Sequence, residues 1–94
     1  MEKLKQKYNL KYENIVWAKV GRKYLVVLLN KKDIKDSLFT TNKCSIDILD
    51  WLLTKKSSEK IINLLSKKYS LSHRRAKTDF LKFIAKLESL KVID

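Results

Sequence analysis

The spacing of apolar residues changes once along this chain, near Asn42, and that change constrains the fold more than any other feature. Before it, residues 15–20 and 24–29 form short runs rich in β-branched and aromatic side chains, which predict two strands. Gly21-Arg22 between them predicts a tight hairpin, because glycine accepts the positive φ that such turns need. Residues 37–41 predict a third strand, shorter and more polar, as is typical of a sheet edge.

After Asn42 the apolar residues recur at the spacing of amphipathic helices. Asn42, either Ser57 or Ser58, and Ser72 are predicted N-caps of three successive helices, the last running from about 73 to 90. The predicted buried stripe of the last helix consists of Ala76, Phe80, Phe83, Ile84 and Leu87. Three strands followed by three helices predict an α+β fold in which helices cover one face of a three-stranded sheet.

The length of 94 residues predicts one hydrophobic core, which we assign to residues 15–94. Residues 1–14 are read as a basic N-terminal arm, which could be frayed, helical or an added strand. A single cysteine cannot form an internal disulfide, no apolar run is long enough to span a membrane, and the first residues do not resemble a secretory signal. These features predict a cytoplasmic protein without a membrane partner.

The chain has 22 Lys and Arg against 10 Asp and Glu, a formal net charge of +12. This excess indicates an acidic partner such as nucleic acid, an anionic surface or an acidic peptide. The alternative is a solvated surface without a specific role, because only three of the basic residues are arginine, the side chain that clamps phosphates and reads bases best.

Catalytic motifs are missing from the sequence. It has no phosphate-binding loop, no dinucleotide fingerprint and no paired metal-ligand spacing. Cys44 falls in the first turn of a helix, where a lowered thiol pKa is conceivable, and His73 falls at a helix start. We interpret Cys44 as a partly buried filler and His73 as a surface residue. The carboxylates of Asp47, Asp50, Asp79 and Glu88 are interpreted as helix-surface charges. The prediction is a protein that is not an enzyme and has no cofactor or metal.

Three stretches of the helical half resemble the PqqD-like proteins, and the strands before them agree in order and length. The matching positions are Asn42, Ser45, Ile48, Leu49 and Leu52, then Ser57, Ile61, Leu65 and Tyr69, and finally Asp79, Phe80, Phe83, Ile84, Leu87, Val92 and Ile93. The resemblance covers about residues 15–94. Two glycines usual in that family, after the first helix and near the C-terminus, are replaced here by Thr54 or Lys55 and by Lys91.

PqqD-like proteins are RiPP recognition elements, so the resemblance implies a winged helix-turn-helix-like domain that binds the leader of a ribosomally made precursor peptide. In the family, the leader adds an antiparallel strand to the third strand and lies beside the third helix. A free-standing version implies an enzyme partner such as a protease, a cyclase or a radical SAM enzyme, as in lasso-peptide maturation.

The residues themselves are compatible with such a site. The predicted third strand carries no charge and no proline, so its free edge can accept another strand. On the last helix Leu81 lies off the core stripe among polar residues, which predicts a shallow groove. The predicted peptide-binding residues are Ser37, Leu38, Phe39, Thr40 and Thr41 on the strand and Arg74, Lys77, Leu81, Ile84 and Glu88 on the helix.

Other functions stay open at this point. A winged helix-turn-helix domain can bind DNA, with residues 71–75 as the best local candidate for contacts to a duplex. The protein could instead be an adaptor that docks to a subunit through an apolar surface. A homodimer through the edge strand is also conceivable.

Overall fold

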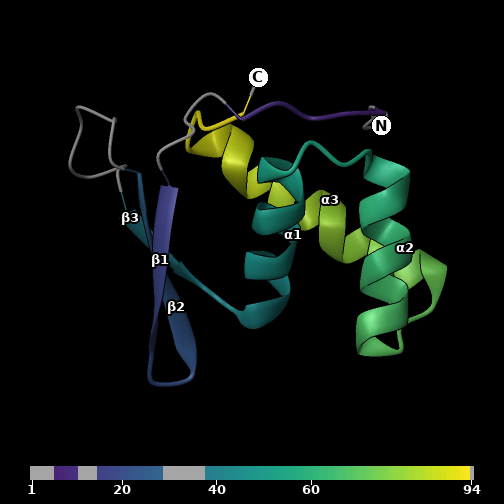
Figure 1. Ribbon diagram of the computed structural model, residues 1–94, viewed down its shortest axis with the longest axis horizontal. Coiled ribbons are helices and arrows are strands. Elements are labelled where there is room, and N and C mark those ends of the chain that lie inside the picture. The colour runs from purple at the N-terminus through teal and green to yellow at the C-terminus, as the bar shows by residue number, and fades with distance from the viewer. Residues whose placement is uncertain (1–5, 11–14, 29–37, 94) are drawn as a thin grey trace.

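The computed structural model describes residues 6–10, 15–28 and 38–93, and its elements follow the predicted order. They are β1 (Ile15–Val20), β2 (Lys23–Leu28), β3 (Leu38–Thr41), α1 (Lys43–Leu53), α2 (Ser58–Tyr69) and α3 (His73–Ser89). The sheet lies on one side of the molecule and the helices on the other (Figure 1). The predicted α+β fold is therefore confirmed. Ser37 lies outside the described residues.

The sheet is antiparallel throughout, in the order β1-β2-β3, so β2 is the central strand. This position explains why every residue from Tyr24 to Leu28 is apolar or aromatic. Gly21 has a φ of +65° and occupies the first position of the two-residue turn, as in a type II′ hairpin, which confirms the role expected of it. The side chains at Trp17, Val26 and Phe39 form one cross-strand row that packs toward the helices.

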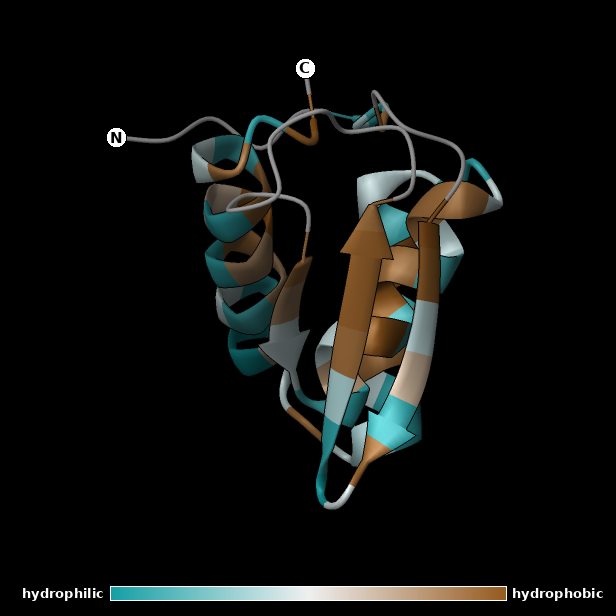
Figure 2. Cartoon of the chain, turned by 90° about the vertical axis from the view of Figure 1, so that its left-hand side faces the viewer, coloured by the Kyte–Doolittle hydropathy of each residue, from teal (hydrophilic) through white to brown (hydrophobic). Residues whose placement is uncertain are grey.

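The opposite face of the sheet is also apolar. A second cross-strand row, Val16–Val27–Leu38, points away from the helices because side chains alternate along each strand. Val16 and Leu38 are each 48% exposed, and Val20 on the same face is 61% exposed. Figure 2 looks onto the sheet from this side and shows that hydrophobic residues dominate the central strand.

Each helix begins at one of the predicted capping residues. The side-chain oxygen of Asn42 accepts a hydrogen bond from the Ser45 backbone N–H at 2.9 Å. The hydroxyls of Ser57 and Ser72 accept the corresponding bonds at the starts of α2 and α3. These contacts satisfy backbone donors that the first helical turn leaves unpaired, so Asn42, Ser57 and Ser72 fix where the helices begin.

Part of the predicted N-terminal arm packs against the helices. The ring of Tyr8 is 7% exposed and meets the ring of Phe80 edge-on, with centroids 5.8 Å apart. The backbone N–H of Ser58 donates to the Gln6 carbonyl at 2.8 Å. Leu10 pairs with Ile93 in an isolated antiparallel bridge. Residues 6–10 therefore contact α2, α3 and the C-terminal segment, and none of these contacts involves β3.

The two positions where the family resemblance expects glycine have a left-handed backbone. Lys55 has a φ of 64° and Lys91 a φ of 58°, a region that costs a side-chain-bearing residue about 1–2 kcal/mol. Glycine adopts it freely but loses more entropy on folding.

We expect Lys91→Gly to raise the free energy of unfolding by about 0.5 kcal/mol, measured by urea denaturation. Lys67→Gly, within α2, is the control and should lower it by about 1 kcal/mol.

Candidate functional site

The hairpin geometry determines which backbone groups of the sheet are free. The two-residue turn makes Val20 and Lys23 a hydrogen-bonded pair. Because hydrogen-bonded and non-hydrogen-bonded pairs alternate along an antiparallel ladder, Ala18 and Leu25 are again a hydrogen-bonded pair. Leu25 therefore directs its N–H and C=O toward β1. Its pairing with Thr40 on the other side must be of the non-hydrogen-bonded kind.

The consequence for β3 is an outer edge whose backbone groups take part in no strand pairing among the described residues. Thr40 directs its N–H and C=O away from β2, and Leu38, two residues earlier, does the same. No strand pairs with this side of β3 in the part of the chain that the structure describes. Such an edge is a template for strand addition.

The helix α3 runs beside this edge (Figure 2) and leaves a hollow next to it. The hollow, which we call the β3–α3 hollow, has a volume of about 310 Å³ and lies between the end of β3, the first turns of α1 and one flank of α3. Its lining residues are Thr41, Asn42, Cys44, Ser45, Ile48, Arg75, Asp79, Lys82, Phe83 and Lys86. Most of the charged groups are cationic, because α3 supplies three basic side chains and one carboxylate.

One of these basic side chains contacts the edge directly. The Lys86 ammonium donates a hydrogen bond to the Thr40 carbonyl at 3.1 Å and lies 5.0 Å from the centre of the Phe39 ring. The Arg75 guanidinium is 3.3 Å from the Asp79 carboxylate. Lys82, one turn before Lys86, has no ion-pair partner among the described residues. The site therefore offers strand-pairing groups that no strand uses, one of which accepts from Lys86, next to a positively charged helix flank.

The groove predicted on α3 is not the one beside β3. With Phe80 as the reference and about 100° per residue, the lining residues from Arg75 to Lys86 lie on one side of the core stripe. The predicted set lies on the other side. Arg74, Lys77 and Glu88 are exposed there, and Leu81 is partly buried against the core. Ile84 is 2% exposed and belongs to the core, so it cannot line a surface groove.

The only cysteine of the chain, Cys44, is half-buried at the β3–α3 hollow. Burial raises the pKa of the Cys44 thiol, and the nearby carboxylates of Asp79 and Asp47 raise it further. The lowered pKa that was conceivable from its place at a helix start is therefore not found, and its partial burial agrees with the interpretation of Cys44 as a filler. His73 is exposed at the start of α3, as expected.

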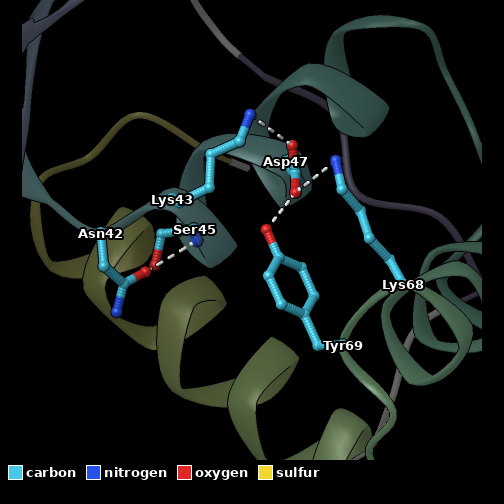
Figure 3. Close-up of polar contacts among 6 residues, drawn as sticks. All are labelled: Asn42, Lys43, Ser45, Asp47, Lys68 and Tyr69. Carbon is cyan, nitrogen blue, oxygen red and sulfur yellow. Dashed lines mark hydrogen bonds and ion pairs between the residues drawn. The ribbon is translucent and has the colours of Figure 1, made fainter.

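A second polar cluster joins α1 to α2, and sequence reasoning missed it. Asp47, interpreted as a surface charge, is only 7% exposed. Its carboxylate accepts a short hydrogen bond from the Tyr69 hydroxyl and lies 2.9 Å from the Lys68 ammonium and 3.3 Å from that of Lys43 (Figure 3). The sequence offered one indication of this cluster. A carboxylate lies on the predicted first helix, and a neighbouring Lys and Tyr that could bind it lie at the end of the second.

The same cluster makes stability depend on pH. Burial opposes the charged form of Asp47, but its bonds with Tyr69, Lys68 and Lys43 prevail and lower its pKa below the usual 3.8. Burial and the bond to Asp47 raise the pKa of Tyr69, so its hydroxyl stays protonated as the donor. The contribution of the charged Asp47 to the free energy of unfolding is therefore complete above pH 3.8 and is lost as the pH falls through the lower, folded-state pKa.

We expect the difference in unfolding free energy between wild type and Asp47→Asn to shrink in denaturant titrations below pH 3.8.

Comparisons with known proteins identify a shared fold. No protein-family model and no curated protein sequence matches the chain. A solved structure of TbiB1 in complex with the TbiA(beta) leader peptide matches with a TM-score of 0.70, over 92% of this chain and 94% of that chain, at 16% sequence identity. This likeness supports the α+β, winged helix-like architecture, and it concerns the fold.

The described residues contain neither a candidate metal site nor a helix suited to a membrane. No group of three or more His, Cys, Asp or Glu side chains there could hold a metal ion. None of the described helices is long and apolar enough to cross a membrane.

Proposed function

We propose that this chain is a non-catalytic binding protein that captures an extended peptide by strand addition to β3, and that the peptide is the leader of a ribosomally made precursor. The observation that carries the proposal is the outward direction of the backbone groups of Leu38 and Thr40 at an unpaired edge. The likeness to TbiB1, a protein solved with a leader peptide, supports it.

The edge accounts for affinity and α3 for selectivity. A guest strand opposite Leu38 and Thr40 would form up to four backbone hydrogen bonds, each contributing about 0.5–1.5 kcal/mol. Backbone bonds do not depend on side chains, so the guest must be selected by groups beside the edge. We assign that role to Phe39, Lys82 and Lys86, with Thr41 and Arg75 at the β3–α3 hollow.

Delivery of the bound peptide to a separate enzyme completes the proposed function. A protein that holds only the leader leaves the remainder of the precursor accessible. A protease, a cyclase or a radical SAM enzyme would act on that remainder in the cytoplasm.

The test is an NMR titration of labelled protein with the leader of the short peptide encoded nearest to this chain's gene. We expect the amide signals of Leu38 and Thr40 to shift and to become protected from hydrogen exchange on binding. The amides of Lys77 and Leu81, on the far flank of α3, should change much less. Binding that leaves Leu38 and Thr40 unchanged would refute strand addition at this edge.

One observation favours a second candidate, binding to duplex DNA. Arg74 and Lys77 are exposed near the start of α3 and have no ion-pair partner among the described residues. Phosphate contacts by such residues would make affinity fall steeply with salt. Sequence-dependent binding to a duplex, weakened by Arg74→Ala and not by changes in β3, would support this candidate over peptide capture.

A further inference from the structure

Lys86 occupies a position that a guest strand needs. The Thr40 carbonyl is one of the outward acceptors of β3, and the Lys86 ammonium already donates to it at 3.1 Å. A guest whose backbone N–H pairs with this carbonyl must share or replace that contact. The guest N–H therefore competes with the Lys86 ammonium for this carbonyl, which favours displacement of the ammonium.

A displaced ammonium needs a new partner, because a charged donor left unpaired at an interface is costly. The protein offers little for this purpose on the same flank of α3. Lys82, one turn earlier, is also a cation. Asp79, almost two turns earlier, is already paired with Arg75. An anion supplied by the guest would give the Lys86 ammonium that partner.

We infer that the guest peptide is selected for an acidic side chain, which binds between Lys82 and Lys86 once Lys86 leaves the Thr40 carbonyl. This inference rests on the proposed function. An antiparallel guest has its N-terminal side near Thr41, where the β3–α3 hollow lies. Because side chains alternate along a strand, only guest residues opposite Phe39 or Thr41 face the helices, so the acidic residue is placed opposite Thr41, beside the hollow.

The experiment uses the same leader peptide with each Asp or Glu changed singly to its amide. Each peptide is titrated by calorimetry against wild type, Lys86→Met, Lys82→Met and the double variant. Lys67→Met, on the exposed side of α2, is the matched control. One amide substitution is expected to weaken binding to wild type and to Lys67→Met by about 10-fold, as for loss of one charge-assisted hydrogen bond. The same substitution should change binding to the double variant by less than about 2-fold.

A charge exchange distinguishes pairing from general attraction. Lys86→Glu should bind the leader poorly and recover when the identified acidic residue is changed to Lys. Equal losses for every acidic position, or full binding by Lys86→Met irrespective of peptide charge, would overturn the inference while strand addition stands. A leader with no acidic residue that binds wild type tightly would also overturn it. Failure of any leader to bind wild type would instead remove the proposed function and this inference together.

Discussion

Replacing Thr40 by proline should weaken leader binding at least about 10-fold while the protein remains folded. The Thr40 N–H points away from β2, so the sheet does not use it, whereas a guest strand does. Proline removes that donor and places its ring where the guest backbone would lie. Loss of about 1.4 kcal/mol or more of binding free energy corresponds to the expected change in affinity, measured by calorimetry.

The neighbouring residue provides the control. Phe39 directs its backbone groups toward β2, because orientation alternates along β3. Phe39→Pro should therefore remove a ladder hydrogen bond and lower the melting temperature, which Thr40→Pro should not. Unchanged leader affinity in a folded Thr40→Pro protein would show that peptides do not add to this edge.

Asp47→Asn should cause the largest loss of stability among the polar substitutions considered, about 2–3 kcal/mol at neutral pH. The substitution removes the charge of a largely buried carboxylate, which weakens its bond from the Tyr69 hydroxyl and leaves the half-exposed Lys68 ammonium without its charged partner. For a chain of this size, such a loss lowers the melting temperature by roughly 4–8 °C per kcal/mol, measurable by circular dichroism.

Asp50→Asn is the matched control, since this carboxylate is exposed on the same helix. It should change the free energy of unfolding by less than about 0.5 kcal/mol. Equal effects of the two substitutions would mean that burial of Asp47 contributes nothing specific to the contact between α1 and α2.

The fold was predictable because local signals agreed with one another. The turn at Gly21, the capping residues Asn42, Ser57 and Ser72 and the change of apolar spacing all specify local backbone geometry. Each feature depends on residues close in sequence. The strand order β1-β2-β3 then follows from the hairpin and from the tendency of strands that are consecutive in the chain to pair.

The geometry of the candidate site was predictable only in part. The edge strand was identified correctly, but the facing side of α3 was not, because a helical stripe locates the core and leaves two polar flanks that look alike in sequence. Arg74 and Arg75 are adjacent residues, yet only Arg75 lines the β3–α3 hollow. Which flank meets the sheet depends on how α3 crosses α1 and α2, a tertiary property. The burial of Asp47 has the same origin, since its partners Lys68 and Tyr69 belong to another helix.

Strand addition would change the apolar outer face of the sheet. The row Val16–Val27–Leu38 ends at the edge strand, so a fourth strand would extend it by one more outward side chain. The peptide-bound and peptide-free forms would then differ in the width of the exposed apolar row on the face of the sheet that points away from the helices. A partner protein that binds this apolar row would therefore distinguish the peptide-bound form from the free form without contacting the flank of α3 that selects the guest.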